Sequence, residues 1–421
     1  MNRILFSLSN FGYVRLLNIG LRGITLASKF LLIFFLAKFF EPRDLGIYGL
    51  FVALIGYGIY VIGFEFYTYS MRELIGSPRE NRAKIIKNQF ALYFFAYLLF
   101  LPVIFLYFYY SDLPWNFFWW AVVVLVLEHI AQELNRILVS LSEQLYAGVV
   151  LFVRTGLWGF VVITAQWLDF ELRNLDFIFL MWSISCLMAC FLAVKRIASL
   201  CGSFSGLKVD IGWIALGLKI AFPMLLASLA LRGIFTFDKY FVESVGGLEI
   251  LGSYVLFIGM ATAVISFIDA GVIDFSYPKI VMASRLMDKD GFAREMTLLL
   301  RNVVFLGAFL IVFCAVLGYF IVGYIGKSLY VNNISILYWL LVAIGINALS
   351  LIPHVGLYAL GKDRAIVFSQ VFGFLVFLIF VLFFKSFFGI ISVLSALCLA
   401  WLSILLWKVV AYRSAVLKFN K

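Results

Sequence analysis

Basic side chains within long apolar stretches are the residues of this sequence best placed to do chemistry. Arginine and lysine donate charge-assisted hydrogen bonds to phosphate and carboxylate groups, and the fork of arginine matches phosphate oxygens. A charge at the centre of a bilayer costs roughly 2.5–3.5 kcal/mol, so such residues should face water, a ligand or an opposite charge. The sequence therefore predicts a cationic, anion-binding cavity lined by six residues: Arg22, Lys29, Arg154, Arg232, Lys219 and Arg301.

The spacing of three basic residues indicates that they share one helix face. Arg15, Arg22 and Lys29 recur every seven residues, so they lie along one stripe of the first helix. Arg232 lies well inside the corresponding helix of the second half. Two other interpretations stay open. Arg22 and Arg301 are close enough to helix ends to reach the lipid headgroups, and the more central cations could each pair with an acidic neighbour.

Acidic residues in the same stretches are candidates for gating or for coupling to an ion gradient. Four residues are considered for this role: Glu65, Glu128, Asp238 and Asp269. Structural ion pairing within the helix bundle is the alternative role for each of them, and Glu133 is a further acidic residue available for such a pair.

Histidine and cysteine do not form the pattern of a metal site. The chain has two histidines, His129 and His354, which we expect to be packed or hydrogen-bonded within helices. Cys186 and Cys190 share a helix face, but no further ligands accompany them. We interpret all five cysteines as small core residues, and the sequence predicts neither a metal nor a cofactor.

The composition places these charges in a membrane protein. Of 421 residues, 65% are hydrophobic and 13% charged, whereas soluble domains have roughly 45–50% apolar and about 25% charged residues. Soluble enzymes, disordered proteins and disulfide scaffolds are therefore excluded. The net charge of +11 comes mainly from residues between the apolar stretches. It therefore indicates orientation in a membrane, and we expect no nucleic-acid partner.

The apolar pattern predicts twelve transmembrane helices, because a helix of about 20 apolar residues crosses a bilayer. No alternating strand pattern accompanies them. The predicted spans are residues 16–40, 45–66, 90–110, 117–138, 145–166, 177–194, 219–241, 250–270, 298–322, 336–360, 366–384 and 390–410.

The basic residues between these spans fall mainly on one side of the membrane. Residues 72–87 and 279–294 are the richest such connections. The positive-inside rule then places both termini in the cytoplasm, which agrees with an even number of helices.

A short motif repeats at close to half the length of the chain. Leu45-Gly46-x-Tyr48-x-Leu50-Phe51 recurs as Leu251-Gly252-x-Tyr254-x-Leu256-Phe257, and each copy opens the second helix of its half. The predicted fold is therefore all-α, with two six-helix bundles, residues 1–200 and 201–421, related by a pseudo-twofold axis along the membrane normal. We expect a substrate cleft between the two bundles.

The connections between the spans are short, so the sequence leaves no room for a soluble catalytic domain. A phosphate-binding loop of the G-x-x-x-x-G-K-[ST] type is also missing from the sequence. We therefore do not expect an enzyme, and any transport should draw its energy from gradients, membrane potential or mass action.

Several short segments resemble exporters of polysaccharide biosynthesis of the O-antigen flippase type, within the superfamily that also contains multidrug antiporters and lipid II flippases. The resemblance extends over essentially the whole chain. It rests on Ala37-Lys38, Asp44-Leu45-Gly46-Ile47-Tyr48, Gly63-Phe64 and Arg72-Glu73 in the first half, and on Phe222-Pro223, Asp238-Lys239, Gly252-x-Tyr254 and Pro278 in the second.

The resemblance implies a flippase of a bacterial inner membrane. Such a protein moves undecaprenyl-pyrophosphate-linked oligosaccharide units of O-antigen or a related surface polysaccharide, as in lipopolysaccharide biosynthesis, from the cytoplasmic to the periplasmic leaflet by alternating access. Its expected partners are the polyprenyl-pyrophosphate-linked glycan, membrane lipids, and a polysaccharide polymerase with its chain-length machinery. The family places its cavity charges only loosely, so the six cations are assigned from their positions in the helices.

A multidrug exporter of the same fold, driven by H⁺ or Na⁺, is the alternative. Such an exporter should have an acidic cavity suited to cations, whereas the balance of charge within these spans is basic. A membrane-embedded glycan polymerase or ligase is disfavoured, because those enzymes present a large outer loop and this sequence has none.

Overall fold

The computed structural model describes residues 2–111, 113–204, 206 and 208–419, and it gives only the backbone for residues 2–16, 18 and 19. The side chain of Arg15, one end of the predicted cationic stripe, therefore lies outside the described residues. Within the described ranges there is no β-strand. The helices up to the start of the second half are α1 (Asn2–Phe39), α2 (Pro42–Gly63), α3 (Tyr67–Leu74), α4 (Arg79–Tyr110), α5 (Asn116–Ser140), α6 (Gln144–Phe152), η1 (Val153–Leu157), α7 (Trp158–Leu168), η2 (Phe170–Leu172) and α8 (Leu175–Leu200).

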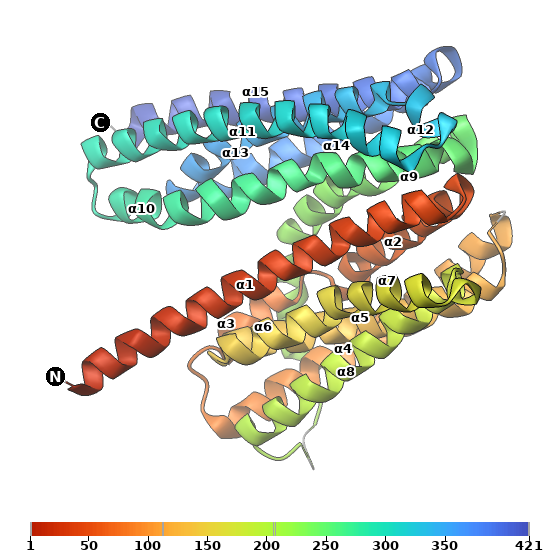
Figure 1. The fold of residues 1–421 in the computed structure, drawn as a ribbon. Helices are drawn as coiled ribbons and strands as arrows, with labels where there is room; N and C mark the ends of the chain where they lie inside the picture. Colours follow the sequence, from red (N-terminus) through yellow and green to blue (C-terminus); the bar gives the residue numbers. More distant parts are fainter. Residues whose placement is uncertain (1, 112, 205, 207, 420–421) are drawn as a thin grey trace. The chain divides into compact units, whose positions relative to one another are not determined.

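The second half of the chain continues in the same way. Its helices are α9 (Ile211–Ile268), η3 (Asp269–Ile273), α10 (Asp274–Arg285), α11 (Lys289–Ile325), α12 (Ser328–Asn332), α13 (Ser335–Ala359), α14 (Asp363–Phe388) and α15 (Ile390–Phe419). Figure 1 shows how long these helices are relative to the turns that connect them.

Eleven helical segments of the described chain are long and apolar enough to cross a membrane, which confirms a multi-pass membrane protein. Predicted spans 219–241 and 250–270 fall within one of these segments, because α9 continues through both. Gly247 interrupts α9 with φ 76°, a left-handed conformation that glycine adopts without a Cβ clash. Divided at Gly247, α9 accounts for two spans, and the predicted twelve are recovered.

The chain forms two compact units. The first contains Met1–Phe40 and Leu54–Leu225, and the second contains Glu41–Ala53 and Leu226–Lys421. Helices α2 and α9 therefore each contribute residues to both units. The start of α9 belongs to the first unit because Trp213 packs edge-on against Phe66 and at a tilt against Tyr69, with ring centroids 5.5 and 5.0 Å apart.

Within the first unit, α1 packs closely on η1 and α7 through small residues. The Ser28 hydroxyl donates to the carbonyl oxygen of Gly156 at 2.5 Å. A Cβ at Gly159 would overlap the Ser28 hydroxyl, and one at Gly156 would lie 3.0 Å from the Thr25 hydroxyl. Thr25 and Ser28 are therefore buried against these glycines, and the remaining faces of α1 are free to carry its charged residues.

Within the second unit, α13, α14 and α15 form a tight group (Figure 1). Gly373 of α14 packs against Ile404 of α15, and Gly356 of α13 packs against the ring of Tyr412 of α15. These small residues allow close approach of helices, as is typical of helix packing in membranes.

The two copies of the repeated motif lie against one another in the second unit. A Cβ at Gly46 would overlap the carbonyl oxygen of Leu248, and one at Gly252 would overlap the carbonyl oxygen of Pro42. Each glycine therefore allows its own helix to touch the backbone beside the other copy. This reciprocal contact explains why both copies contain glycine at the same place.

Candidate functional site

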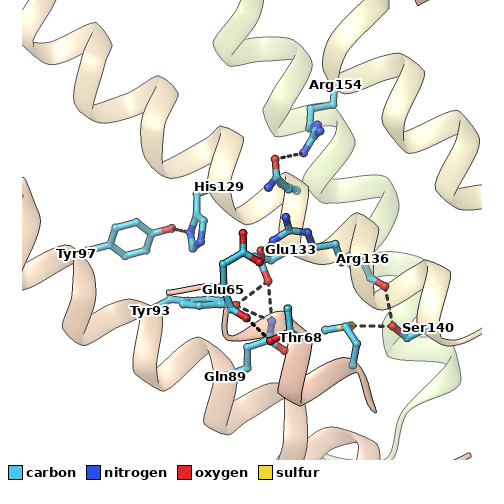
Figure 2. A network of polar contacts seen from close by, with 12 residues as sticks. Glu65, Thr68, Gln89, Tyr93, Tyr97, His129, Glu133, Arg136, Ser140 and Arg154 are labelled. Atoms are coloured by element: carbon cyan, nitrogen blue, oxygen red, sulfur yellow. Dashed lines mark hydrogen bonds and ion pairs between the residues drawn. The ribbon is translucent and has the colours of Figure 1, made fainter. Parts of the chain in front are cut away.

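Helices α4 and α5 of the first unit face each other with matching polar residues. Gln89, Tyr93 and Tyr97 follow one another at intervals of four residues in α4, and His129 and Glu133 do so in α5. Residues four apart share a helix face. The side chains pair in reverse order along the two helices, as antiparallel neighbours do (Figure 2).

The carboxylate of Glu133 lies at the centre of this network and is completely buried. Its Oε2 accepts hydrogen bonds from Gln89 Nε2 at 2.8 Å and from Tyr93 Oη at 2.7 Å. Its Oε1 accepts one from Arg136 Nη1 at 2.5 Å. The Arg136 guanidinium also lies over the ring of Tyr67, 3.5 Å from its centroid. These donors offset the loss of water around a buried charge.

His129 continues the network toward the middle of α5. Its Nδ1 is 2.6 Å from the hydroxyl oxygen of Tyr97, and its ring packs edge-on against Tyr93 with centroids 4.6 Å apart. Its Nε2 is buried and has no hydrogen-bond partner among the described residues. A Cβ at Gly63 would lie 3.1 Å from this nitrogen, so the end of α2 closes over it.

The turn after α2 brings a second carboxylate to the network. Phe64 and Glu65 have φ angles of 51° and 54°, in the left-handed region that residues other than glycine rarely adopt. Only 4% of the surface of Glu65 is exposed. Burial first, and then the negative charge of Glu65, raise the pKa of Tyr67 to about 12, so this hydroxyl remains a proton donor at neutral pH. Figure 2 shows Glu65 beside Glu133 and Arg136.

Together these groups form a buried, acidic network. Glu65 and Glu133 both interact with Arg136. Counted over these three residues and a neutral His129, the charge is −1. Such an arrangement can accept a proton or another small cation, because a buried charge imbalance is costly.

Another face of α5 carries a separate ion pair. Glu128 Oε1 lies 3.6 Å from Arg154 Nε, and both side chains are about nine-tenths buried. Arg154 Nη1 also donates to Gln132 Oε1 at 3.5 Å (Figure 2). The other Glu128 oxygen accepts from the Trp182 indole at 3.2 Å and lies 3.0 Å from the Cys186 sulfur.

Arg154 reaches this position from a distorted helix. Residues Val153–Leu157 form a π-helix, η1, between α6 and α7. The widened turn leaves the Val153 carbonyl oxygen to accept a hydrogen bond from the Ser185 hydroxyl of α8. Such π-bulges occur frequently at functional sites. Here the bulge lies where Arg154 pairs with Glu128, the arrangement that the ion-pair alternative describes.

Asp238 in the second unit is also enclosed. It is completely buried, its Oδ2 accepts from the Tyr254 hydroxyl at 2.5 Å, and its Oδ1 lies 3.2 Å from Lys239 Nζ. Tyr254 belongs to the second copy of the repeated motif. The hydrogen bond from Tyr254 to this predicted gating residue thus links the two parts of α9 that Gly247 separates. Asp269, another candidate, begins η3 and is half-buried.

The other predicted cations have exposed side chains. In the first unit these are Arg22 and Lys29 of α1 and Lys219 near the start of α9. In the second unit they are Arg232 of α9 and Arg301 of α11. Lys29 lies at the middle of the span Gly20–Phe39. Arg232 is far from both the start of α9 and its break at Gly247.

The sequence reasoning missed most of the α4–α5 network. The sequence patterns described above assign no role to Gln89, Tyr93, Tyr97 or Arg136. A signal was available: the four-residue spacing in α4 matches the spacing of His129 and Glu133. Lys408, which is 4% exposed in α15, was also missed.

Comparisons with known proteins identify the fold. No protein-family model and no curated protein sequence matches the chain. Among solved structures, an inward-facing multidrug-resistance MATE family transporter of the MOP superfamily is similar, with 13% identity and a TM-score of 0.73, covering 93% of this chain and 95% of the other.

Two further solved structures are also similar to this chain. A MOP superfamily transporter from Pyrococcus furiosus, described as having a binding pocket of reversed polarity, has 13% identity and a TM-score of 0.56 over 97% of this chain and 95% of its own. A point mutant of the Vibrio cholerae MATE transporter VcmN has 14% identity and a TM-score of 0.56 over 97% and 96%. At these identities the comparisons establish a MATE-like, two-lobed helical fold.

Proposed function

We propose that this protein is a secondary transporter that exports a polyprenyl-pyrophosphate-linked glycan by alternating access. The observation that carries the proposal is the exposure of Lys29 and Arg232, two cations far inside apolar helices of membrane length. Exposure to acyl chains would cost roughly 2.5–3.5 kcal/mol for each charge. Contact with water and an anionic cargo removes that cost.

The chemistry of these side chains suits a pyrophosphate. Arginine and lysine form charge-assisted hydrogen bonds to phosphate oxygens, and these offset the desolvation of the cargo's charged head. The polyprenyl tail stays in lipid. Outward movement of each negative charge gains roughly 2.3 kcal/mol per 100 mV of membrane potential, which supplies a driving force.

Surface glycan in cells that lack their own flippase tests this proposal. We expect Lys29→Gln and Arg232→Gln each to lower export roughly tenfold or more, because a hydrogen bond to a charged group is worth about 1.5–3 kcal/mol. Lys29→Arg and Arg232→Lys should retain most of the export. The proposal fails if both neutral variants, at wild-type abundance in the membrane, support full export.

Cation-coupled multidrug export is the second candidate, and two observations favour it. The similar structures are described as multidrug or MATE transporters, which supports this candidate more than glycan export. The α4–α5 network also holds two buried carboxylates, Glu65 and Glu133, against Arg136, which suits the binding of a coupling cation.

Proteoliposomes loaded with a cationic dye distinguish the two candidates. If the second is correct, a proton or sodium gradient drives dye movement, and Glu65→Gln abolishes it. Glu171→Gln, at an exposed position of the first unit, serves as the control. Dye movement that is unaffected by either gradient would leave glycan export as the function to pursue.

A further inference from the structure

Lys408 occupies a core position in α15. The buried residues Ala400, Ile404 and Lys408 follow one another at four-residue intervals, and Tyr412 is next on the same face. Ile404 packs on Gly373 of α14 and Tyr412 packs on Gly356 of α13. Lys408 therefore lies between the contacts that α15 makes with its two neighbours, and only 4% of it is exposed.

The amine of Lys408 differs from the other cations enclosed in the described helices. Arg154 is paired with Glu128, and Lys239 is paired with Asp238. For Lys408, no ion pair or hydrogen bond to a described residue is present, and no described acidic side chain interacts with it. A buried ammonium without a counter-charge is costly, so this amine stays protonated only where a counter-charge comes from outside these residues.

A second polar group lies within electrostatic range of this amine. His354 of α13 is close enough to interact electrostatically with Lys408. Its Nδ1 is buried and has no hydrogen-bond partner among the described residues. Buried polar atoms of this kind normally bind protein groups, water or ions. An enclosed lysine of α15 and a buried histidine nitrogen of α13 therefore lie within electrostatic range of each other in the second unit.

We propose that Lys408 and His354 form a buried site for a small monovalent inorganic anion, of which chloride is the simplest. The anion accepts hydrogen bonds from the lysine ammonium and from the histidine ring and neutralises the lysine charge. A cation is disfavoured because the site has an ammonium and no carboxylate. Water would satisfy the hydrogen bonds but would leave the charge uncompensated. The proposal is independent of the transported cargo.

Thermal unfolding of the purified full-length protein in detergent tests this site. Sodium gluconate is replaced stepwise by sodium chloride at constant ionic strength, and Tm is measured at each step. A bound anion stabilises the folded state by mass action, so we expect a saturable rise in Tm for the wild type. Lys408→Arg should keep this rise, and Lys408→Met should abolish it.

Two further variants complete the experiment. Lys418→Met removes an exposed charge from the same helix and should respond to chloride like the wild type. His354→Asn should shift the midpoint of the response to at least several-fold higher chloride. No chloride-dependent rise in the wild type, or an equal rise in Lys408→Met, would overturn the proposal. If Lys408→Met does not fold, the wild-type titration and the midpoint of the His354→Asn response still test the proposed anion site.

Discussion

At the scale of single residues, the interior of the first unit depends on carboxylates that are matched with donors. Glu133 has three donors, Gln89, Tyr93 and Arg136, although it has no access to water. A fully satisfied buried charge fixes the positions of its partners, and a partly satisfied one destabilises the fold. The network therefore fixes the register between α4 and α5.

Removal of the central carboxylate should be far more harmful than removal of one of its donors. We expect Glu133→Ala to lower the free energy of unfolding by about 3–5 kcal/mol, because Arg136 then loses the carboxylate that accepts its hydrogen bond. Tyr93→Phe should cost about 0.6–1.5 kcal/mol, since Glu133 keeps its other donors. Unfolding in mixed detergent measures both, with Glu171→Ala as an exposed control. Equal losses for the two buried variants would contradict this account.

The Glu128–Arg154 pair yields a different prediction. Arg154→Ala alone leaves a buried carboxylate, so it should be more destabilising than the double variant Glu128→Ala with Arg154→Ala. The coupling energy from a double-mutant cycle should be about 0.5–3 kcal/mol. Additive losses would mean that the two charges, 3.6 Å apart, do not stabilise each other.

At the scale of helices, glycines determine which elements can touch. Gly46 and Gly252, from the two copies of the repeated motif, bring α2 and the later part of α9 into backbone contact within the second unit. Gly247 meanwhile provides the left-handed residue that divides α9 into two spans.

Addition of one methyl group at the motif contact should therefore be destabilising. Gly252→Ala places a Cβ on the Pro42 backbone, which cannot move aside as a flexible side chain would. We expect Tm to fall by several degrees, because overpacking of this kind costs typically about 1–3 kcal/mol. Gly323→Ala in α11, where a Cβ meets nothing within 4 Å, is the matched control. A Tm equal to that of the control would refute the close contact.

The sequence was sufficient to predict the helices but not all of the contacts between them. Hydropathy predicts the spans because the bilayer fixes their length, and the repeat predicts where the second helix of each half begins. The contact between Gly46 and Gly252 could not be predicted, because a repeated motif in the sequence carries no information on whether its two copies are in contact. The burial of Lys408 was hidden for a similar reason: near the end of a span, lysine usually extends to the headgroups.

At the scale of the whole molecule, the fold supports a membrane protein of two helical units, and the charges support the proposed cargo. The MATE-like fold indicates a membrane protein built from two helical units. The charges supply the argument about cargo, because Lys29 and Arg232 are exposed whereas Arg154 is about nine-tenths buried. We therefore propose the exposed cations, rather than Arg154, as the residues that contact the cargo directly.

Translocation of a fluorescent polyprenyl-pyrophosphate-linked oligosaccharide across proteoliposomes that contain only this protein is the most direct measurement. We predict protein-dependent movement of the labelled head between leaflets, faster when the potential favours outward transfer of negative charge, and slowed roughly tenfold or more in the Lys29→Gln, Arg232→Gln double variant. Movement no faster than in protein-free vesicles, with folded protein verified in the same membranes, would contradict the central claim.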